Sequence, residues 1–441
     1  MAGRVWQSIV LLAALAPAAF AATTCGDGSQ CPEGTPCCSQ YGECGVGAYC
    51  LGGCDPVNSF SLDACVPAPV CESKTFTFDN LDGMVSNTKY LGDASTADWV
   101  YSGTPLSHNG SVLLTMAEGT VGTLLASTHY IWYGKVTGKF STSAGAGVVT
   151  AFILLGDSKD EIDFEFVGVE LSIAQTNFYS QGVTDYSNGE NATGISDVHA
   201  NMHTYELDWT YDNITWSIDG NVVRTLNRED TWNATANRYS YPQTPSRLQL
   251  SLWPGGLSTN GQGTIDWAGG LVTWDSPYMT NGYYYAMFDE VDIQCYDPPS
   301  GTQENGTKSY IYTDKAMTNN TVEITNDNTV LKSFLGSGLN MSAGSASASA
   351  SGSAATSDAP TVPGLTGSGS GADGQRGSGD SSSSSADSSS TATATGSAST
   401  GFVQGDGGSK SGADQFGGNS ESLLRGSLLA VVVAMVGLCV L

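Results

Sequence analysis

The sequence has 441 residues, enough for about three domains of average size, but its composition is too uneven to divide that way. With 16 basic and 43 acidic side chains its formal net charge is −27, which argues against nucleic-acid binding because phosphates need clustered basic side chains. Only 13% of residues are charged and 55 are glycine, so much of the chain lacks the composition of a packed core. These features are typical of a secreted protein with long unpacked segments.

The first 21 residues have the layout of a secretory signal peptide. Arg4 precedes an apolar run that extends from Ile9 to Phe20, and Ala19-Phe20-Ala21 supplies the small-x-small cleavage site. We therefore expect residues 1–21 to be removed and the mature chain to begin near Ala22.

Residues 22–72 are rich in cysteine and glycine and poor in large apolar side chains, so covalent bridges rather than a core must hold them. Nine of the eleven cysteines lie between Cys25 and Cys71, and the other two are Cys295 and Cys439. Because Cys439 falls in a tail that we expect to be removed, an even ten remain, which indicates an oxidising compartment. The secretory route is also supported by seven N-glycosylation sequons, at Asn109, Asn191, Asn213, Asn233, Asn305, Asn319 and Asn340.

Residues 73 to about 299 have the composition of a globular domain and contain eight of the nine tryptophans. Short runs rich in Val, Ile, Thr, Tyr and Trp alternate with Gly, Asn and Asp, for example at 131–136, 148–155 and 204–212. No long segment keeps the 3.6-residue apolar period of a helix. The pattern predicts an all-β sandwich.

Two segments follow that are not expected to fold. Residues 343–420 consist mainly of Ser, Ala, Gly and Thr, which bury too little surface to fold and indicate a disordered, O-glycosylated stalk. The apolar run that ends the chain, residues 428–441, has 14 residues, fewer than the ~20 of a membrane-spanning helix. Because small residues near Gly417 and a polar segment precede it, we interpret residues 421–441 as a GPI-attachment signal, with a membrane anchor as the alternative.

The segment richest in chemistry is Asp160-Glu-Ile-Asp-Phe-Glu-Phe166. In a strand, Glu161, Asp163 and Glu165 share one face, while the three intervening apolar residues face the core. Neighbouring like charges raise the pKa of at least one of these carboxylates. Cleavage of a glycosidic bond needs such a set, with one carboxylate as nucleophile or base and a protonated one as acid.

The alternative for this segment is a solvated strand of an acidic protein. Against it, three carboxylates on one face repel each other, and no basic residue lies between residues 160 and 166. The Cα atoms of Glu161 and Glu165 would be ~13 Å apart at ~3.3 Å per residue. Their side chains must therefore lean inward to approach the ~5 Å separation of a retaining glycosidase.

The acidic segment resembles the E-x-D-x-E catalytic signature of glycoside hydrolase family 16, whose members are retaining enzymes with a β-jelly-roll fold. Four more segments resemble the fungal Crh cell-wall transglycosylases of that family, namely 132–135, 175–179, 203–209 and 253–256. The resemblance covers nearly all of residues 25–312 and implies a catalytic domain over 73–312. It also implies that Glu161 is the nucleophile, Glu165 the general acid/base, and Asp163 the residue that positions and tunes the nucleophile.

The resemblance further implies a retaining transglycosylase, secreted to the cell wall and GPI-anchored to the plasma membrane. Such an enzyme cleaves β-1,4 linkages of chitin through a glycosyl-enzyme and transfers the chain to β-glucan or chitin. We expect a monomer whose partners are these polysaccharides and, through the GPI lipid, the membrane; no cofactor or metal is expected. A hydrolase with little transfer, acting as a chitinase or β-glucanase, and a non-catalytic chitin-binding wall protein are the alternatives.

Transfer requires an acceptor sugar to displace water, and aromatic rings that stack on pyranose faces would hold that sugar in place. The candidates are Tyr133, Tyr179, Trp253 and Trp267, with Gln175 as a hydrogen-bonding partner. Core packing is the alternative for each aromatic residue. We expect His203 and Trp209 to belong to the scaffold.

The cysteine spacing from Cys25 to Cys50 resembles the hevein-type chitin-binding module. That resemblance implies a sugar site at Ser39, Tyr41 and Tyr49, although Glu43 stands where such modules usually carry an aromatic ring. A disulfide-held spacer is the alternative. The bridges implied by the resemblance are Cys25–Cys38, Cys31–Cys44 and Cys37–Cys50. Three pairings are open to the remaining four cysteines, and we favour Cys54–Cys65 with Cys71–Cys295.

Overall fold

The computed structural model describes residues 23–26, 28–345 and 359–362 of the 441. The expected signal peptide (1–21), nearly all of the expected stalk (343–420) and the expected GPI signal (421–441) lie outside these residues. Within the described ranges, no helix is both long enough and apolar enough to cross a membrane.

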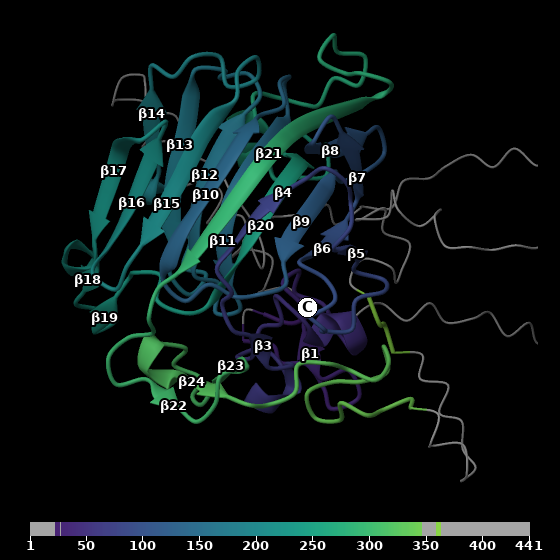
Figure 1. The fold of residues 1–441 in the computed structure, drawn as a ribbon, viewed down its shortest axis with the longest axis vertical. Helices are drawn as coiled ribbons and strands as arrows, with labels where there is room; N and C mark the ends of the chain where they lie inside the picture. Colours follow the sequence, from purple (N-terminus) through teal and green to yellow (C-terminus); the bar gives the residue numbers. More distant parts are fainter. Residues whose placement is uncertain (1–22, 27, 346–358, 363–441) are drawn as a thin grey trace, which may run out of the picture.

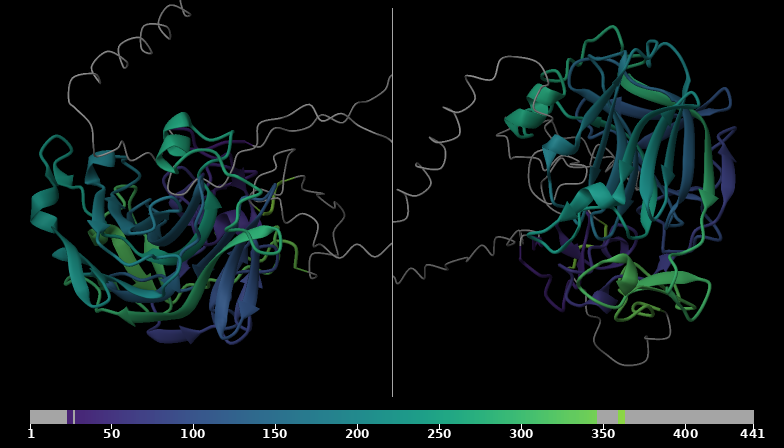
Figure 2. Two further views of the ribbon diagram at one scale, coloured as in Figure 1. Left: turned by 90° about the horizontal axis from the view of Figure 1, so that it is seen from above. Right: turned by 90° about the vertical axis from the view of Figure 1, so that its left-hand side faces the viewer.

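Two eight-stranded sheets face each other and form most of the described structure, as Figures 1 and 2 show. The first, which we call the acidic sheet, has the order β14-β13-β12-β11-β20-β9-β6-β5. The second, the outer sheet, has the order β17-β16-β15-β10-β21-β8-β7, with β4 paired to β21. Neighbouring strands in both are antiparallel except β5 and β6. The expected all-β sandwich is therefore confirmed.

The strands of the acidic sheet are β5 (Met84–Ser86), β6 (Trp99–Ser102), β9 (Thr123–Ser127), β11 (Val148–Gly156), β12 (Glu161–Val167), β13 (Ile173–Tyr179), β14 (Glu190–Thr193) and β20 (Ser246–Pro254). Those of the outer sheet are β4 (Lys74–Thr77), β7 (Thr104–His108), β8 (Ser111–Ala117), β10 (Gly134–Ser141), β15 (His203–Trp209), β16 (Asn213–Ile218), β17 (Asn221–Asn227) and β21 (Tyr283–Cys295). The pair β18 (Trp232–Asn233) and β19 (Arg238–Tyr239) forms a small separate sheet. The short helices are η1 (Gly47–Cys50), η2 (Leu62–Ala64), η3 (Tyr186–Asn188), η4 (Arg228–Thr231), η5 (Asn319–Thr321) and α1 (Gln262–Trp267).

Aromatic side chains from both sheets fill the core between them. Phe140 of β10 lies with its ring centroid 4.4 Å from that of Tyr205 and 4.5 Å from that of Phe288, both in the outer sheet. From the acidic sheet, Phe152 lies 5.6 Å from Phe140 and Phe164 lies 5.5 Å from Tyr205. Successive side chains of a strand point to opposite faces of the sheet. The residues next to these core rings on the acidic sheet therefore point to the face away from the core.

The Cys-rich segment, residues 23–72, packs at one end of the sandwich, coloured purple in Figure 1. Its regular structure is limited to η1, η2 and three two-residue strands, β1 (Cys37–Cys38), β2 (Cys44–Gly45) and β3 (Ala68–Pro69). Five disulfides involve it: Cys25–Cys38, Cys31–Cys44, Cys37–Cys50, Cys54–Cys65 and Cys71–Cys295. The first three are the pairs that the hevein resemblance implies, and the last two are the pairing favoured from the sequence. The last one links the Cys-rich segment to the end of β21.

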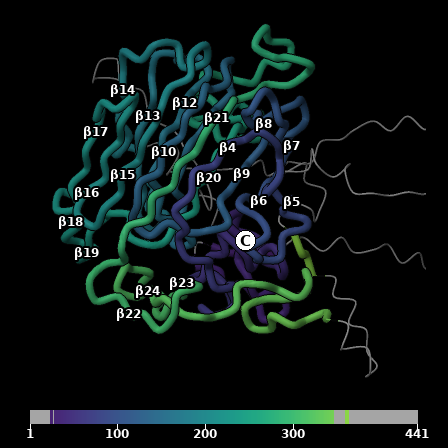
Figure 3. Tube along the Cα trace, in the orientation of Figure 1, coloured from purple at the N-terminus to yellow at the C-terminus, as the bar shows by residue number. Residues whose placement is uncertain are grey.

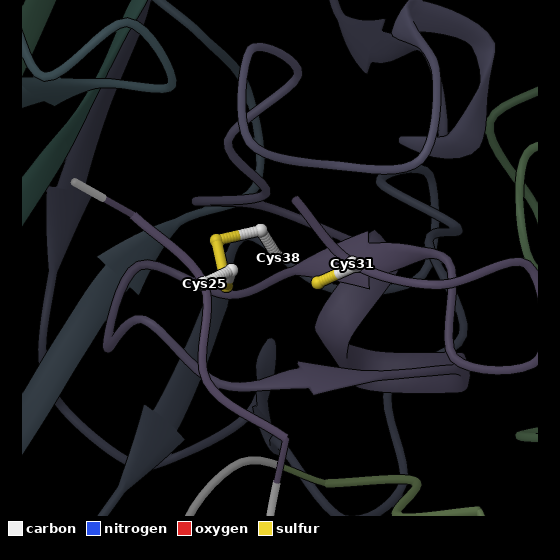
Figure 4. Close-up of side chains that lie close together, drawn as sticks. All are labelled: Cys25, Cys31 and Cys38. Atoms are coloured by element: carbon white, nitrogen blue, oxygen red, sulfur yellow. A yellow bond between two sulfur atoms is a disulfide. The ribbon is translucent and has the colours of Figure 1, made fainter. Parts of the chain in front are cut away.

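Three cysteine sulfurs in this segment lie close enough together to suggest a metal site. Those of Cys25, Cys31 and Cys38 are all within 4.8 Å of one another. Figure 4 shows the bond between Cys25 and Cys38, and Cys31 is bonded to Cys44. Because the thiolate, not a disulfide sulfur, binds metals, this cluster is the covalent core of the segment.

Folded structure continues beyond residue 312, where the sequence analysis ended the catalytic domain. The strands β22 (Gln303–Glu304), β23 (Ser309–Tyr312) and β24 (Val322–Thr325) form a four-stranded sheet with β3. The chain then runs back past the Cys-rich segment (Figure 3), where Gly47 N donates to Gly336 O and Gly338 N to Ala64 O. We call residues 303–345 the C-terminal strap. Its composition of Asn, Thr, Ser and Gly is close to that of a loop, so it gave little sign of folding.

Candidate active site

The three acidic residues of β12 share the face of the acidic sheet that points away from the core. Glu161 is 4% exposed, Asp163 is 1% exposed and Glu165 is partly buried. Between them, Ile162 and Phe164 belong to the core, as does Phe166. The period of two in the sequence thus places three carboxylates in a row on a strand that is anchored from behind.

The two strands beside β12, namely β11 and β13, place different kinds of side chain next to the carboxylates. On β11, small or apolar residues stand opposite the acids: Leu155 opposite Glu161, Ile153 opposite Asp163 and Ala151 opposite Glu165. On β13, hydrogen-bonding residues stand opposite them: Tyr179 opposite Glu161, Asn177 opposite Asp163 and Gln175 opposite Glu165. Directly paired residues project to the same side of a sheet, so the carboxylates have an apolar flank and a polar flank.

Burial and mutual repulsion shape the protonation of these carboxyls. The pKa of Glu165 is raised well above its ordinary value, first by burial and then by the negative charges of Asp163 and Glu161. Burial also raises the pKa of Asp163, while the positive charge of Arg224 and the backbone amide of Asn177 act in the opposite direction. Crowding carboxylates in this way favours a state in which at least one of them holds a proton.

Arg224, which the sequence did not single out, lies behind β13, the neighbour of β12, between the two sheets. This residue of β17 donates from Nη1 to the carbonyl oxygen of Thr176 at 2.8 Å and from Nη2 to that of Asn188 at 2.7 Å. Its guanidinium carbon lies 4.7 Å from the ring centroid of Trp216, whose Nε1 donates to the Asp163 carbonyl oxygen at 2.9 Å. A buried cation and a fixed backbone thus support the middle carboxylate from the core side.

Four of the five predicted sugar-binding residues gather around the carboxylates. Tyr179 and Gln175 stand beside Glu161 and Glu165 on β13. The Nε1 of Trp267, at the end of α1, donates to Gln175 Oε1 at 2.8 Å. The ring of Trp267 stacks on that of Trp253, with centroids 5.9 Å apart and planes at 29°. Gln175, the residue opposite Glu165, thus bonds Trp267 with its oxygen and Glu170 Oε2 with its nitrogen, at 3.3 Å. Because Trp253 is only 1% exposed, Trp267 is the ring of the pair that is partly open.

The fifth predicted residue, Tyr133, is not part of this face, which corrects the expectation. It immediately precedes β10, in the outer sheet, and is 2% exposed within the core. Its ring centroid lies 4.8 Å from that of Trp209. His203 is also in the outer sheet, where its Nδ1 pairs with Asp219 Oδ2 at 2.6 Å. His203 and Trp209 therefore occupy the scaffold, as the sequence analysis expected.

Strand β20 contributes polar residues that the sequence analysis missed. Arg247, Gln249 and Ser251 stand opposite Leu155, Ile153 and Ala151, so they share the face of the carboxylates. Gln249 and Ser251 are each 1% exposed, and neither Gln249 Oε1 nor Ser251 Oγ has a hydrogen-bond partner in the described part of the chain. Polar atoms buried this deeply normally have partners. A ligand with many hydroxyl groups would supply them.

The residues expected to bind sugar in the Cys-rich segment lie against the acidic sheet. Tyr49 is fully buried and Ser39 is 3% exposed, with Ser39 Oγ accepting from the backbone amides of Tyr41 and Glu43, each at 3.3 Å. All three residues, Ser39, Tyr41 and Tyr49, border a recess that Arg247 of β20 also lines.

Comparison with known proteins gives these features a context. Residues 93–269 match the family model described as glycosyl hydrolases family 16. The chain is 60% identical to Crh-like protein 3 of Botryotinia fuckeliana, over 98% of this chain and 99% of that one. It is 56% identical to Crh-like protein 2 of Aspergillus fumigatus, over 77% of this chain and 78% of that protein. A solved structure described as Crh5 transglycosylase in complex with NAG is 30% identical, with a TM-score of 0.50, and the match covers 62% of this chain and 99% of that one.

Proposed function

Because the chain belongs to the Crh-like cell-wall transglycosylases of glycosyl hydrolases family 16, we propose that it cuts β-1,4 linkages in chitin and joins the freed chain to β-glucan or chitin. The observation that carries this proposal is the row of three carboxylates on β12, in which Glu165 has a raised pKa. The complex of the Crh5 transglycosylase with NAG supports a donor built from N-acetylglucosamine.

In the first step, Glu161 acts as the nucleophile. Its carboxylate oxygen bonds to the anomeric carbon of the donor, and the glycosidic C–O bond breaks. Glu165 gives its proton to the leaving oxygen, which departs as a hydroxyl on the rest of the chain. The raised pKa of Glu165 supports this role, because the group must hold a proton at the start of the reaction.

In the second step, the glycosyl-enzyme ester is opened by an acceptor. Glu165, now ionised, takes the proton of the incoming hydroxyl while that oxygen bonds to the anomeric carbon, and Glu161 leaves as a carboxylate. If the hydroxyl belongs to water, the product is a hydrolysed chain. If it belongs to a sugar, a new linkage with the original configuration forms.

Asp163 positions the nucleophile and tunes the charge of the site in this proposal. Its side chain stands between those of Glu161 and Glu165 on the same face. As an anion it disfavours ionisation of Glu165, which keeps the acid protonated. Arg224 and the Asn177 amide offset the effect of burial on Asp163 itself.

Aromatic rings near Glu165 would favour sugar over water. Trp267 offers a partly buried indole that packs on the buried ring of Trp253, and its Nε1 donates to Gln175, the residue opposite Glu165 on β13. We infer that these residues, with Tyr179, hold a sugar ring against the glycosyl-enzyme at high effective concentration.

The cellular location of the protein is inferred from its family and its sequence. The protein acts outside the cell in the wall. We further propose a mature monomer from about residue 22, attached to the plasma membrane through a GPI lipid added after removal of residues 421–441, with residues 343–420 as a stalk. A Cys-rich chitin-binding module (22–72) and a catalytic domain (73–312) complete this proposed organisation.

The test uses chitin oligosaccharides as donors and a fluorescent laminarin oligosaccharide as acceptor, with products identified by mass spectrometry. The proposal expects fluorescent hybrids that contain N-acetylglucosamine, and their absence from a Glu161→Gln sample. Reducing ends without hybrids would assign a hydrolase. Identical inactivity of both proteins, with binding to chitin retained, would assign a non-catalytic wall protein.

A further inference from the structure

A cavity of about 870 Å³ lies at one end of the outer sheet. A volume of this size is typical of small-ligand sites. Its walls include the turn between β15 and β16 (210–212), the first residue of η4 (Arg228), the segment that follows β21 (296–302) and η5 of the C-terminal strap. Figure 1 shows the chain leaving β21 at this end of the sandwich to form the strap. Among the described residues that line the cavity, none belongs to β11, β12 or β13.

Strand pairing brings these segments together, although they are far apart in the sequence. Gly134, the first residue of β10, pairs with Trp209 at the end of β15 and with Cys295 at the end of β21. On the far side of β15, Asn213 at the start of β16 pairs with Asn227 at the end of β17. The connections that follow these strands therefore lie side by side and enclose the cavity.

Two exposed tyrosine rings border the cavity and are held in place by their neighbours. Tyr211 is 40% exposed and Tyr296 is 37% exposed. The guanidinium carbon of Arg228 lies 4.6 Å from the ring centroid of Tyr211 and 3.9 Å from that of Tyr239. Tyr296 Oη donates to Asp208 Oδ1 at 3.0 Å. Rings that are both exposed and fixed suit stacking on the apolar face of a pyranose.

The charged groups around the cavity can both donate and accept hydrogen bonds. Arg228 is a donor, and its Nε is buried without a hydrogen-bond partner in the described part of the chain. Asp212 and Asp297 offer carboxylate acceptors. Sugar hydroxyls donate and accept, so they can bond to both kinds of group. Two carboxylates against one guanidinium disfavour an anionic ligand such as a phosphate. The cysteine cluster is the only group of three or more potential metal ligands among the described residues, so no cation site is indicated here.

We propose that this cavity is a second saccharide site, separate from the catalytic face. A neutral pyranose stacks on the ring of Tyr211 or Tyr296, and its hydroxyls bond to Arg228 and the two carboxylates. The inference goes beyond the proposed function, because it requires no turnover.

The sugar can come from either of two sources. Asn319 lines the cavity and begins the sequon Asn319-Asn320-Thr321, so an N-glycan attached to it would start at the cavity wall. The other source is a wall polysaccharide, and in that case the site keeps the enzyme on the polymer between reaction cycles.

The first experiment tests a free saccharide by calorimetry. The protein carries Glu161→Gln, which stops turnover, and Asn319→Gln, which removes the glycan. Titration with laminarin and chitin oligosaccharides is expected to show a second class of binding site besides the catalytic face. Tyr211→Ala should weaken this second site about tenfold and leave the first unchanged.

The second experiment tests the glycan of Asn319 by thermal unfolding of the glycosylated protein, with the glycan verified by mass spectrometry of the Asn319 peptide. If the glycan fills the cavity, Tyr211→Ala removes a contact that exists only when the glycan is present. It should then lower the melting temperature by about 2 °C in the glycosylated protein and by much less in the Asn319→Gln background.

Tyr278→Ala is the matched control, because Tyr278 is 41% exposed and is not among the residues that line the cavity. It should behave like its parent in both experiments. An effect of Tyr211→Ala in either experiment supports the site, and the experiment that shows it identifies the source of the sugar. The proposal is overturned if Tyr211→Ala behaves like Tyr278→Ala in both. Failure of the proposed function is recognised separately, because the wild-type protein would then form no hybrid product whatever the cavity binds.

Discussion

The acidic sheet and the Cys-rich segment contact each other, for example through Arg247 and Gln40, but are held in place by different forces. Strand β12 lies inside a sheet, with ladders to β11 and β13 on its two edges and aromatic residues packed behind it. The Cys-rich segment has three two-residue strands and relies on five disulfides and a few polar contacts with the sandwich. The first arrangement fixes the reacting groups rigidly, and the second holds the proposed chitin-binding module against the sandwich. Changes to the first should stop the chemistry, whereas changes to the second should alter which chains are bound.

Loss of the nucleophile should have the largest effect. Glu161→Gln keeps the shape of the side chain but removes its charge, so kcat for transfer should fall by about 10⁴-fold or more. The melting temperature should change little, because relief of repulsion on the acidic face offsets lost contacts. Glu206→Gln, on β15 of the outer sheet, is the control and should keep full activity.

Removing the charge of Asp163, the middle carboxylate, should change the pH dependence of kcat. Glu165 must be protonated to act as the acid, so activity falls as the pH rises through its raised pKa. Asp163→Asn removes a negative charge that raises this pKa, and the alkaline limb of the kcat profile should therefore move to lower pH. We also expect a loss of about 100-fold in kcat. An unmoved limb would mean that Asp163 does not tune Glu165.

Arg224 tests whether the core side of β12 contributes to the site. Its charge lowers the pKa of Asp163, so Arg224→Met should raise that pKa and move the acidic limb of kcat/KM to higher pH. Activity should fall about tenfold. Arg224→Lys keeps the positive charge, so the acidic limb of its kcat/KM profile should lie close to that of the wild type. The two hydrogen bonds to Thr176 and Asn188 would still be lost. A lysine variant that behaves like the methionine variant would indicate a purely structural role.

The smallest effect is expected at the contact between the two regions. A Cβ on Gly52 would clash with the Arg247 guanidinium, so Gly52→Ala must displace this group, which donates to Gln40 of the Cys-rich segment. We expect KM for long chains to rise about threefold, with no change in kcat for short ones. Gly34→Ala is the control in the same segment, because nothing lies within 4 Å of a Cβ at that position. Steady-state kinetics on short and long donors would measure both.

Local patterns in the sequence were enough to place the carboxylates. Alternation over Glu161–Val167 put three acids on one face, and the structure has them there. The same alternation is present in Ser246–Pro254, where Arg247, Gln249 and Ser251 alternate with leucines, so the sequence also carries the signal that places these three side chains on one face.

Other features depend on contacts between segments far apart in the chain. Arg224 lies on an outer-sheet strand, and nothing in its own sequence shows that it faces the back of β13. Tyr133 sits in an aromatic-rich motif, but the strand that follows it pairs in the outer sheet and buries its ring. The C-terminal strap looks like loop by composition and gains its structure from β3 and the Cys-rich segment.

The most direct test of the central claim, a double displacement at Glu161 with a sugar acceptor, is the anomeric configuration of the new linkage. NMR spectroscopy of the hybrid formed from a chitin oligosaccharide and laminarin oligosaccharide measures it. Two successive inversions at the anomeric carbon predict a β linkage in the hybrid, as in the donor. An α linkage, or the absence of any hybrid, would contradict the account.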